Sequence, residues 1–108
     1  MTHKYQQSEF PLKPVDRGGR TLHVGCEARI IAIPDVDFDG FDAVGRTRYV
    51  ALEGRILPVV DLDENGYAIF HLFYSEPADM MGSIRAPRDA SEFYIQEFCF
   101  DPRDVERV

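Results

Sequence analysis

The fold is decided by residues 56–74, which read ILPVVDLDENGYAIFHLFY. Two runs rich in β-branched and aromatic residues flank Asn65-Gly66. This dipeptide favours a type I′ turn, because Asn and Gly tolerate the positive φ that both central residues need. The sequence therefore predicts an antiparallel hairpin between strands at residues 56–62 and 67–74.

Three further runs predict strands on either side of this hairpin. They cover residues 27–33, 47–52 and 93–100, and each is short, rich in β-branched or aromatic residues and followed by a Pro or Gly. Glu53-Gly54 is a weaker turn signal, so residues 47–74 are predicted to form a three-stranded meander. Five short strands with turns between them predict an all-β fold, a small five-stranded antiparallel barrel or a sandwich.

The segments outside these strands predict an arm, a long loop and a closing turn. Residues 1–22 contain Pro11, Pro14 and two adjacent glycines, which indicates an extended N-terminal arm before a domain at residues 23–108. Phe10 and Leu12 are the apolar residues with which this arm could dock. Residues 75–92 predict a long loop with a helical turn near residues 78–81, and Asp101-Pro102 predicts a short C-terminal helical turn.

Charge and hydropathy restrict the classes of partner. The 108 residues fit one domain, and 12 Lys plus Arg against 19 Asp plus Glu give a net charge of −7. This charge opposes direct binding to nucleic acids and to anionic membranes. No apolar run approaches the roughly 20 residues of a membrane span, and residues 1–13 are polar, so we expect a cytoplasmic protein.

Two acidic loops have the first half of a calcium-binding pattern. They read DVDFDG at residues 35–40 and DLDENG at residues 61–66. A calcium loop also needs a bidentate Glu at its twelfth position, which is Arg46 in the first case and Leu72 in the second. The sequence therefore favours turns over metal sites and predicts no cofactor, with a calcium-binding module as an alternative.

Other residues with chemical potential lack a complete pattern. His23 and Cys26 are close in sequence, and His71 and Cys99 would have to join them to make a zinc site, but neither half shows a tight ligand pair. The two cysteines are expected to be reduced and buried rather than bridged. No Ser/His/Asp, Cys/His/Asn or paired-carboxylate arrangement is present, so we predict that the chain is not an enzyme.

The order of strand, acidic loop, meander, excursion, last strand and closing turn resembles the SH3-like small barrels. It is most similar to the barrel of the nitrile hydratase β-subunit and its accessory relatives. The likeness covers roughly residues 23–108 and rests on residues 25–33, 45–50, 70–74, 80–82 and 98–106. It implies a partner subunit that holds a metal in a Cys cluster, which this chain lacks, and a partner-contact role for Arg46 and Arg48.

These observations predict a non-enzymatic protein-interaction module, an accessory or regulatory subunit that binds a protein partner through the acidic loop and the loop at residues 75–92. The predicted contact residues are Asp35, Asp37, Asp39, Asp42, Arg46, Arg48, Met80 and Met81. Paired methionines adapt to irregular surfaces, although they would also suit a lid over the barrel. An acidic nucleic-acid mimic that inhibits a nucleic-acid-binding protein is an alternative, and residues 92–100 are either an edge strand for homodimerisation or core.

Overall fold

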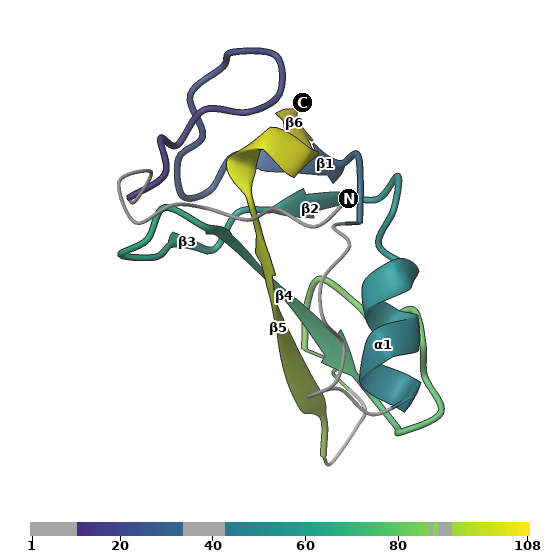
Figure 1. The fold of residues 1–108 in the computed structure, drawn as a ribbon. Helices are drawn as coiled ribbons and strands as arrows, with labels where there is room; N and C mark the ends of the chain where they lie inside the picture. The colour runs from purple at the N-terminus through teal and green to yellow at the C-terminus, as the bar shows by residue number, and fades with distance from the viewer. Residues whose placement is uncertain (1–10, 34–42, 87, 89–91) are drawn as a thin grey trace.

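The computed structural model describes residues 11–33, 43–86, 88 and 92–108. Two three-stranded antiparallel sheets, with strand orders β2-β1-β6 and β3-β4-β5, are accompanied by one short α-helix (Figure 1). The elements are β1 (Glu27–Ile30), α1 (Ala43–Val50), β2 (Ile56–Pro58), β3 (Asp61–Leu62), β4 (Ala68–Tyr74), β5 (Tyr94–Phe100), the 3-10 helix η2 (Pro102–Asp104) and β6 (Val105–Arg107). The chain is a small, mainly-β domain, as the sequence predicted at this coarse level.

The predicted strand at residues 56–62 is divided between the two sheets. The backbone N–H of Val59 donates to the carbonyl of Cys26, just before β1, at 2.8 Å, whereas the N–H of Val60 donates to Ile69 in β4 at 2.9 Å. Consecutive residues therefore bond to different sheets. Pro58 has no backbone N–H, which also interrupts the ladder of a continuous strand.

The hairpin at Asn65-Gly66 is confirmed, but its turn type differs from the predicted one. Asp61 pairs with Ile69 and Leu62 with Ala68 in antiparallel register. Gly66 has φ of 87°, while no described residue other than glycine has positive φ. The turn is consequently a type I turn followed by a left-handed glycine. The carboxylate of Asp63 favours it, because its Oδ1 accepts from the backbone N–H of Asn65 and of Tyr67 at 3.0 and 2.8 Å.

The predicted strand at residues 47–52 is wrong, since this segment lies in α1 and the turn that follows it. The meander at residues 47–74 is therefore wrong as well. Tyr49 and Leu52, three residues apart, are both buried, which is helical rather than strand spacing. The Tyr49 ring lies 5.3 and 5.2 Å from the rings of Phe98 and Phe100, measured between centroids. This packing outweighs the local strand preference of the segment.

The closing turn is confirmed and is followed by a strand that the sequence did not predict. The side chain of Asp101 accepts from the backbone N–H of Arg103 at 2.8 Å, and Pro102 begins the 3-10 helix. The chain then continues into β6, which pairs with β1. In the loop at residues 75–92, Glu76 to Asp79 form a turn, and no helix is assigned to the described residues.

One core lies between the sheets and α1. In β4, the side chains of Ala68, Phe70, Leu72 and Tyr74 face it and are fully buried, as are Phe98 and Phe100 in β5. The N-terminal segment contributes Leu12, which is 8% exposed and whose N–H donates to Asn65 at 2.8 Å. Its predicted docking is confirmed, while Phe10 lies outside the described residues.

The described part of the chain contains no helix with the length and hydrophobicity needed to cross a bilayer.

Candidate functional site

The face of β4 and β5 opposite the core carries an apolar cluster. Phe73 in β4 pairs with Ile95 in β5, and the rings of Phe73 and Phe93 meet edge to face at 5.5 Å. Ile95 is 56% exposed and Phe93 is 43% exposed. We call this surface the outer face; it comprises Ile69, His71, Phe73, Phe93, Ile95, Glu97 and Cys99.

The outer face becomes polar toward the other end of β5. His71 and Glu97 are cross-strand partners, and Nε2 of the histidine lies 3.1 Å from Oε1 of the glutamate. The next pair is Ile69 and Cys99. Partial desolvation raises the pKa of the Cys99 thiol, although the residue is exposed, and the nearby Glu97 and Asp63 raise it further. The raised pKa disfavours the thiolate form of Cys99, the form that acts as a nucleophile.

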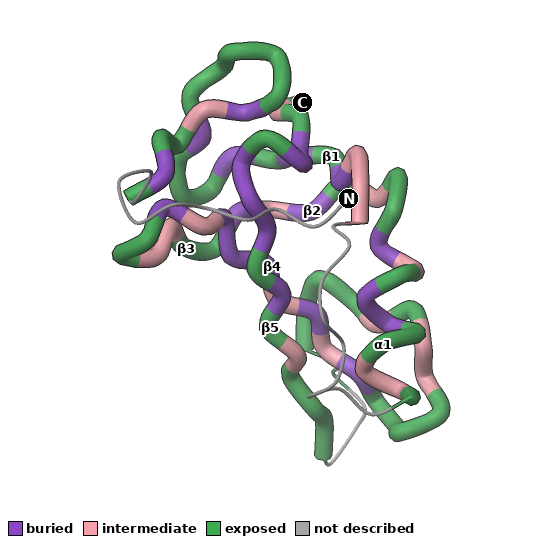
Figure 2. Tube along the Cα trace, in the orientation of Figure 1, coloured by how far each residue is buried: buried purple, intermediate pink, exposed green. Residues whose placement is uncertain are grey.

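β5 is the last strand of its sheet, with β4 on one side only. At its C-terminal end the hydroxyl of Tyr49 donates to the carbonyl of Cys99 at 2.5 Å. No hydrogen bond within the described part of the chain reaches the opposite edge at residues 94–97. Figure 2 shows this first half of β5 as largely exposed. Unpaired strand edges of this kind are templates for another strand.

The loop after β4 is held beside the sheet by Arg48. The guanidinium of Arg48 lies 3.7 Å from the centroid of the Tyr74 ring and donates to three backbone carbonyls, those of Glu76, Pro77 and Asp79. Ser83 then pairs with Phe73 through two backbone hydrogen bonds of 2.7 and 2.8 Å. Met81, two residues before Ser83, is 56% exposed.

Four of the eight predicted contact residues lie within the described part of the chain, and they differ in exposure. Arg46 is exposed on α1, whereas Arg48 is buried and its guanidinium donates to carbonyls of the chain itself, so the partner contact of Arg48 stays a prediction. Met80 is half-buried and Met81 exposed. The remaining four, Asp35, Asp37, Asp39 and Asp42, lie outside the described residues.

The second acidic loop acts as a turn. Oδ1 of Asp61 accepts from the N–H of Leu62 at 2.8 Å, and Asp63 caps the hairpin as described above. Within the described residues, no three His, Cys, Asp or Glu side chains gather as a metal-binding group. Cys26 and Cys99 are free thiols; Cys26 is buried as predicted, whereas Cys99 is exposed.

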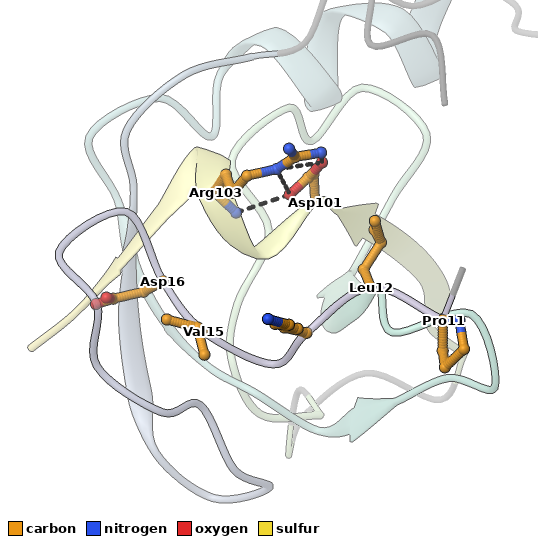
Figure 3. A pocket seen from close by; sticks show the side chains of 7 residues that line it. Pro11, Leu12, Val15, Asp16, Asp101 and Arg103 are labelled. Atoms are coloured by element: carbon orange, nitrogen blue, oxygen red, sulfur yellow. Dashed lines mark hydrogen bonds and ion pairs between the residues drawn. The ribbon is translucent and has the colours of Figure 1, made fainter. Parts of the chain in front are cut away.

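An open groove of about 480 Å³ lies between the N-terminal segment and η2 (Figure 3). Its lining residues are Pro11, Leu12, Lys13, Val15, Asp16, Asp101 and Arg103. The two carboxylates are already used within the chain: Asp101 forms an ion pair with Arg103 at 2.9 Å, and Asp16 accepts backbone hydrogen bonds. The two carboxylates that line the described part of this groove are therefore both engaged within the chain.

Asp16 ties the N-terminal segment to β6. Its side chain is buried; Oδ1 accepts from the N–H of Arg20 at 2.7 Å and Oδ2 from the N–H of Arg107 at 2.6 Å. Burial alone would raise the pKa of this carboxyl. The backbone donors at Arg107, Arg20 and Gly18 outweigh that effect and hold the pKa below its ordinary value.

We predict that Asp16→Asn lowers the free energy of unfolding by about 1–2 kcal/mol at neutral pH, because one buried N–H then faces an amide donor. The lowered pKa means that the Asp16 carboxylate stabilises the fold above the ordinary value of 3.8, and that this contribution is lost as the pH falls through the folded-state pKa. The difference in the free energy of unfolding between variant and wild type should therefore become smaller below about pH 4. Urea unfolding from pH 3 to 7 measures it, and a difference independent of pH would contradict this role.

Comparisons with family models, with curated proteins and with solved structures found no match.

Proposed function

We propose that this chain is a non-enzymatic protein-interaction module, an accessory or regulatory subunit, that binds an extended segment of a partner protein along β5. One observation carries the proposal: Phe93, Tyr94 and Ile95 are 43%, 48% and 56% exposed at the start of a strand whose outer edge is unpaired in the described structure. Neighbouring exposed apolar side chains beside a free edge are typical of a binding surface.

Strand addition explains how the contact is made. An added strand takes hydrogen bonds from the free backbone groups of residues 94–97, and its alternate side chains lie over the outer face. The side chains of the added strand that lie near Phe73 and Ile95 have to be apolar, because these two residues are apolar. Glu97 on the outer face, Asp61 beside Ile69, and the net charge of −7 favour basic residues farther along the segment.

We also propose that the two sheets together form a small SH3-like barrel. Its support is the connection between the two sheets: residues 56–62 pass from the first to the second, and η2 returns the chain from β5 to β6 beside β1. The acidic segment with Asp35, Asp37, Asp39 and Asp42 remains a predicted second contact for a basic partner.

We expect Ile95→Lys to weaken binding of an extended peptide of alternating Val and Lys residues by about tenfold or more, since it removes an apolar contact and adds a like charge. The probe is a fluorescently labelled synthetic peptide, and the readout is anisotropy. Val24→Lys is the matched control, because Val24 is 58% exposed, lies outside both β4 and β5, and the charge change is the same.

The control is expected to bind within twofold of wild type. Equal weakening by both variants would reduce the effect to net charge and contradict the site. Light scattering, which measures the molar mass in solution, gives the second readout. If the wild type is a homodimer and Ile95→Lys is a monomer, β5 binds a second copy of this chain and not another protein, which would overturn the proposal.

A further inference from the structure

The free edge of β5 presents two kinds of side chain on the outer face. Ile95 is apolar and 56% exposed, and its cross-strand partner in β4 is Phe73. Glu97 is the next residue of β5 on the same face, because successive side chains of a strand lie on opposite faces. Gln96 lies between them and belongs to the other face, opposite Leu72. A strand added to β5 therefore meets an apolar and an acidic position at alternate residues.

The carboxylate of Glu97 is open to a partner. The side chain is 59% exposed, and its Oε1 lies 3.1 Å from Nε2 of His71. Within the described part of the chain, this is the one hydrogen bond that reaches the Glu97 side chain. A carboxylate can accept about four hydrogen bonds through its two oxygens, so Oε2 remains for a donor from outside the chain.

The charges around Glu97 favour a cation at this position. The residues that define the outer face, all of them described, include neither Lys nor Arg, and His71 is the one among them whose side chain can carry a positive charge. Asp61 adds an exposed carboxylate opposite Ile69, in the neighbouring row of the sheet. The net charge of −7 has the same sign. A basic side chain of the partner would therefore meet a complementary field beside Glu97.

We propose that Glu97 is a specificity-determining residue, and that the partner segment carries Lys or Arg two residues from an apolar side chain. This inference rests on the proposed strand addition to β5. When the basic residue is opposite Glu97, the residue two positions along is opposite Ile95, and both side chains lie on the outer face. The Cβ atoms of opposite residues are about 4.5–5.5 Å apart, which allows a salt bridge.

The test compares two fluorescently labelled peptides of identical composition by anisotropy. The same-face peptide, Thr-Val-Thr-Lys-Thr-Val-Thr, has its Lys on the face of both Val residues, whichever way the strand runs. The opposite-face peptide, Thr-Val-Lys-Thr-Thr-Val-Thr, has its Lys on the other face. The buffer is at about pH 8, where an ordinary imidazole is neutral. Wild type is expected to bind the same-face peptide about fivefold more tightly, the effect of one cross-strand charge pair.

Two variants locate this preference. Glu97→Gln is expected to bind the two peptides within about twofold of each other, because the charge pair is lost. Glu106→Gln is the matched control: Glu106 is exposed on β6 in the other sheet, so the same charge change should leave the preference at about fivefold. Glu97→Lys should bind a same-face peptide with Glu in place of Lys about tenfold more tightly than wild type does, since repulsion becomes attraction.

Strand addition and charge recognition fail in different ways. If wild type binds neither peptide, or if Ile95→Lys leaves both affinities unchanged, strand addition is wrong and the role of Glu97 falls with it. If Ile95→Lys weakens both peptides but wild type binds the two equally, strand addition stands and the role of Glu97 is overturned. A preference that Glu97→Gln retains, or tighter binding of the acidic peptide than of the same-face peptide to wild type, would overturn that role as well.

Discussion

Phe98→Ala is expected to lower the free energy of unfolding by about 3–5 kcal/mol, the cost of removing a buried phenyl ring and leaving a cavity. Phe98 is fully buried in β5, opposite Phe70, and its ring meets that of Tyr49 edge to face at 5.3 Å. Domains of this size have a total stability of about 5–15 kcal/mol, so the loss is a large fraction of it. Urea unfolding followed by circular dichroism measures the difference.

Phe93→Ala provides the matched comparison, because the same ring is removed beside the same strand. Phe93 is 43% exposed on the outer face, and we expect its loss to cost no more than about 1 kcal/mol. This variant should remain folded but bind the Val/Lys peptide more weakly than the wild type does. Equal destabilisation by the two substitutions would mean that both faces of β5 are core, which contradicts the proposed contact surface.

Arg48→Met is expected to lower the free energy of unfolding by about 2–3 kcal/mol, since hydrogen bonds from a charged donor contribute about 1.5–3 kcal/mol. Arg48 is 8% exposed, and its guanidinium donates to three carbonyls of the loop and covers the Tyr74 ring. Methionine retains part of the packing and none of the donors. Thermal unfolding gives the magnitude, and hydrogen exchange at Ser83 reports whether the loop has detached from Phe73.

Arg46→Met on the same helix is the control for this substitution. Arg46 is exposed, and its replacement should change the free energy of unfolding by less than about 1 kcal/mol and leave exchange at Ser83 unchanged. If the two variants lost the same stability, Arg48 would not be the residue that anchors the loop.

Sequence patterns predicted the parts of the fold that depend on neighbours along the chain. The strands near residues 27–33, 67–74 and 93–100 were found because their apolar and β-branched residues are dense and end at turn signals. The hairpin at Asn65-Gly66 and the turn capped by Asp101 were found for the same local reason. The predicted type I′ geometry failed because the Asp63 carboxylate caps two N–H groups of a different turn.

The errors arise where contacts distant in sequence decide the structure. Thr47, Val50 and Tyr49 give α1 a local strand signature, but Tyr49 packs against rings from β5, some 50 positions away. The division of residues 56–62 depends on which sheet Val59 and Val60 meet. β6 has only three residues and is defined by its pairing with β1.

The candidate surfaces were predictable to different degrees. The sequence left β5 open as an edge strand for homodimerisation or as core; in the structure it is the last strand of its sheet, with Phe98 and Phe100 buried and Tyr94 and Ile95 exposed. The role of Arg48 had no signal in the sequence, since the carbonyls that it binds lie 28 to 31 positions away. The acidic segment at residues 35–42 could be identified from the sequence, because charged residues are evident there. An unpaired strand edge can be identified only in the folded structure.

The proposed strand addition is tested most directly by nuclear magnetic resonance, which locates a bound peptide on the isotopically labelled protein. Addition of the Val/Lys peptide is predicted to shift the amide signals of residues 93–97, with intermolecular nuclear Overhauser effects between the peptide backbone and Tyr94 to Glu97. A peptide that binds with no such effects along β5, and whose contacts lie on α1 or on the β2-β1-β6 sheet instead, would contradict the claim that this chain recognises its partner by strand addition.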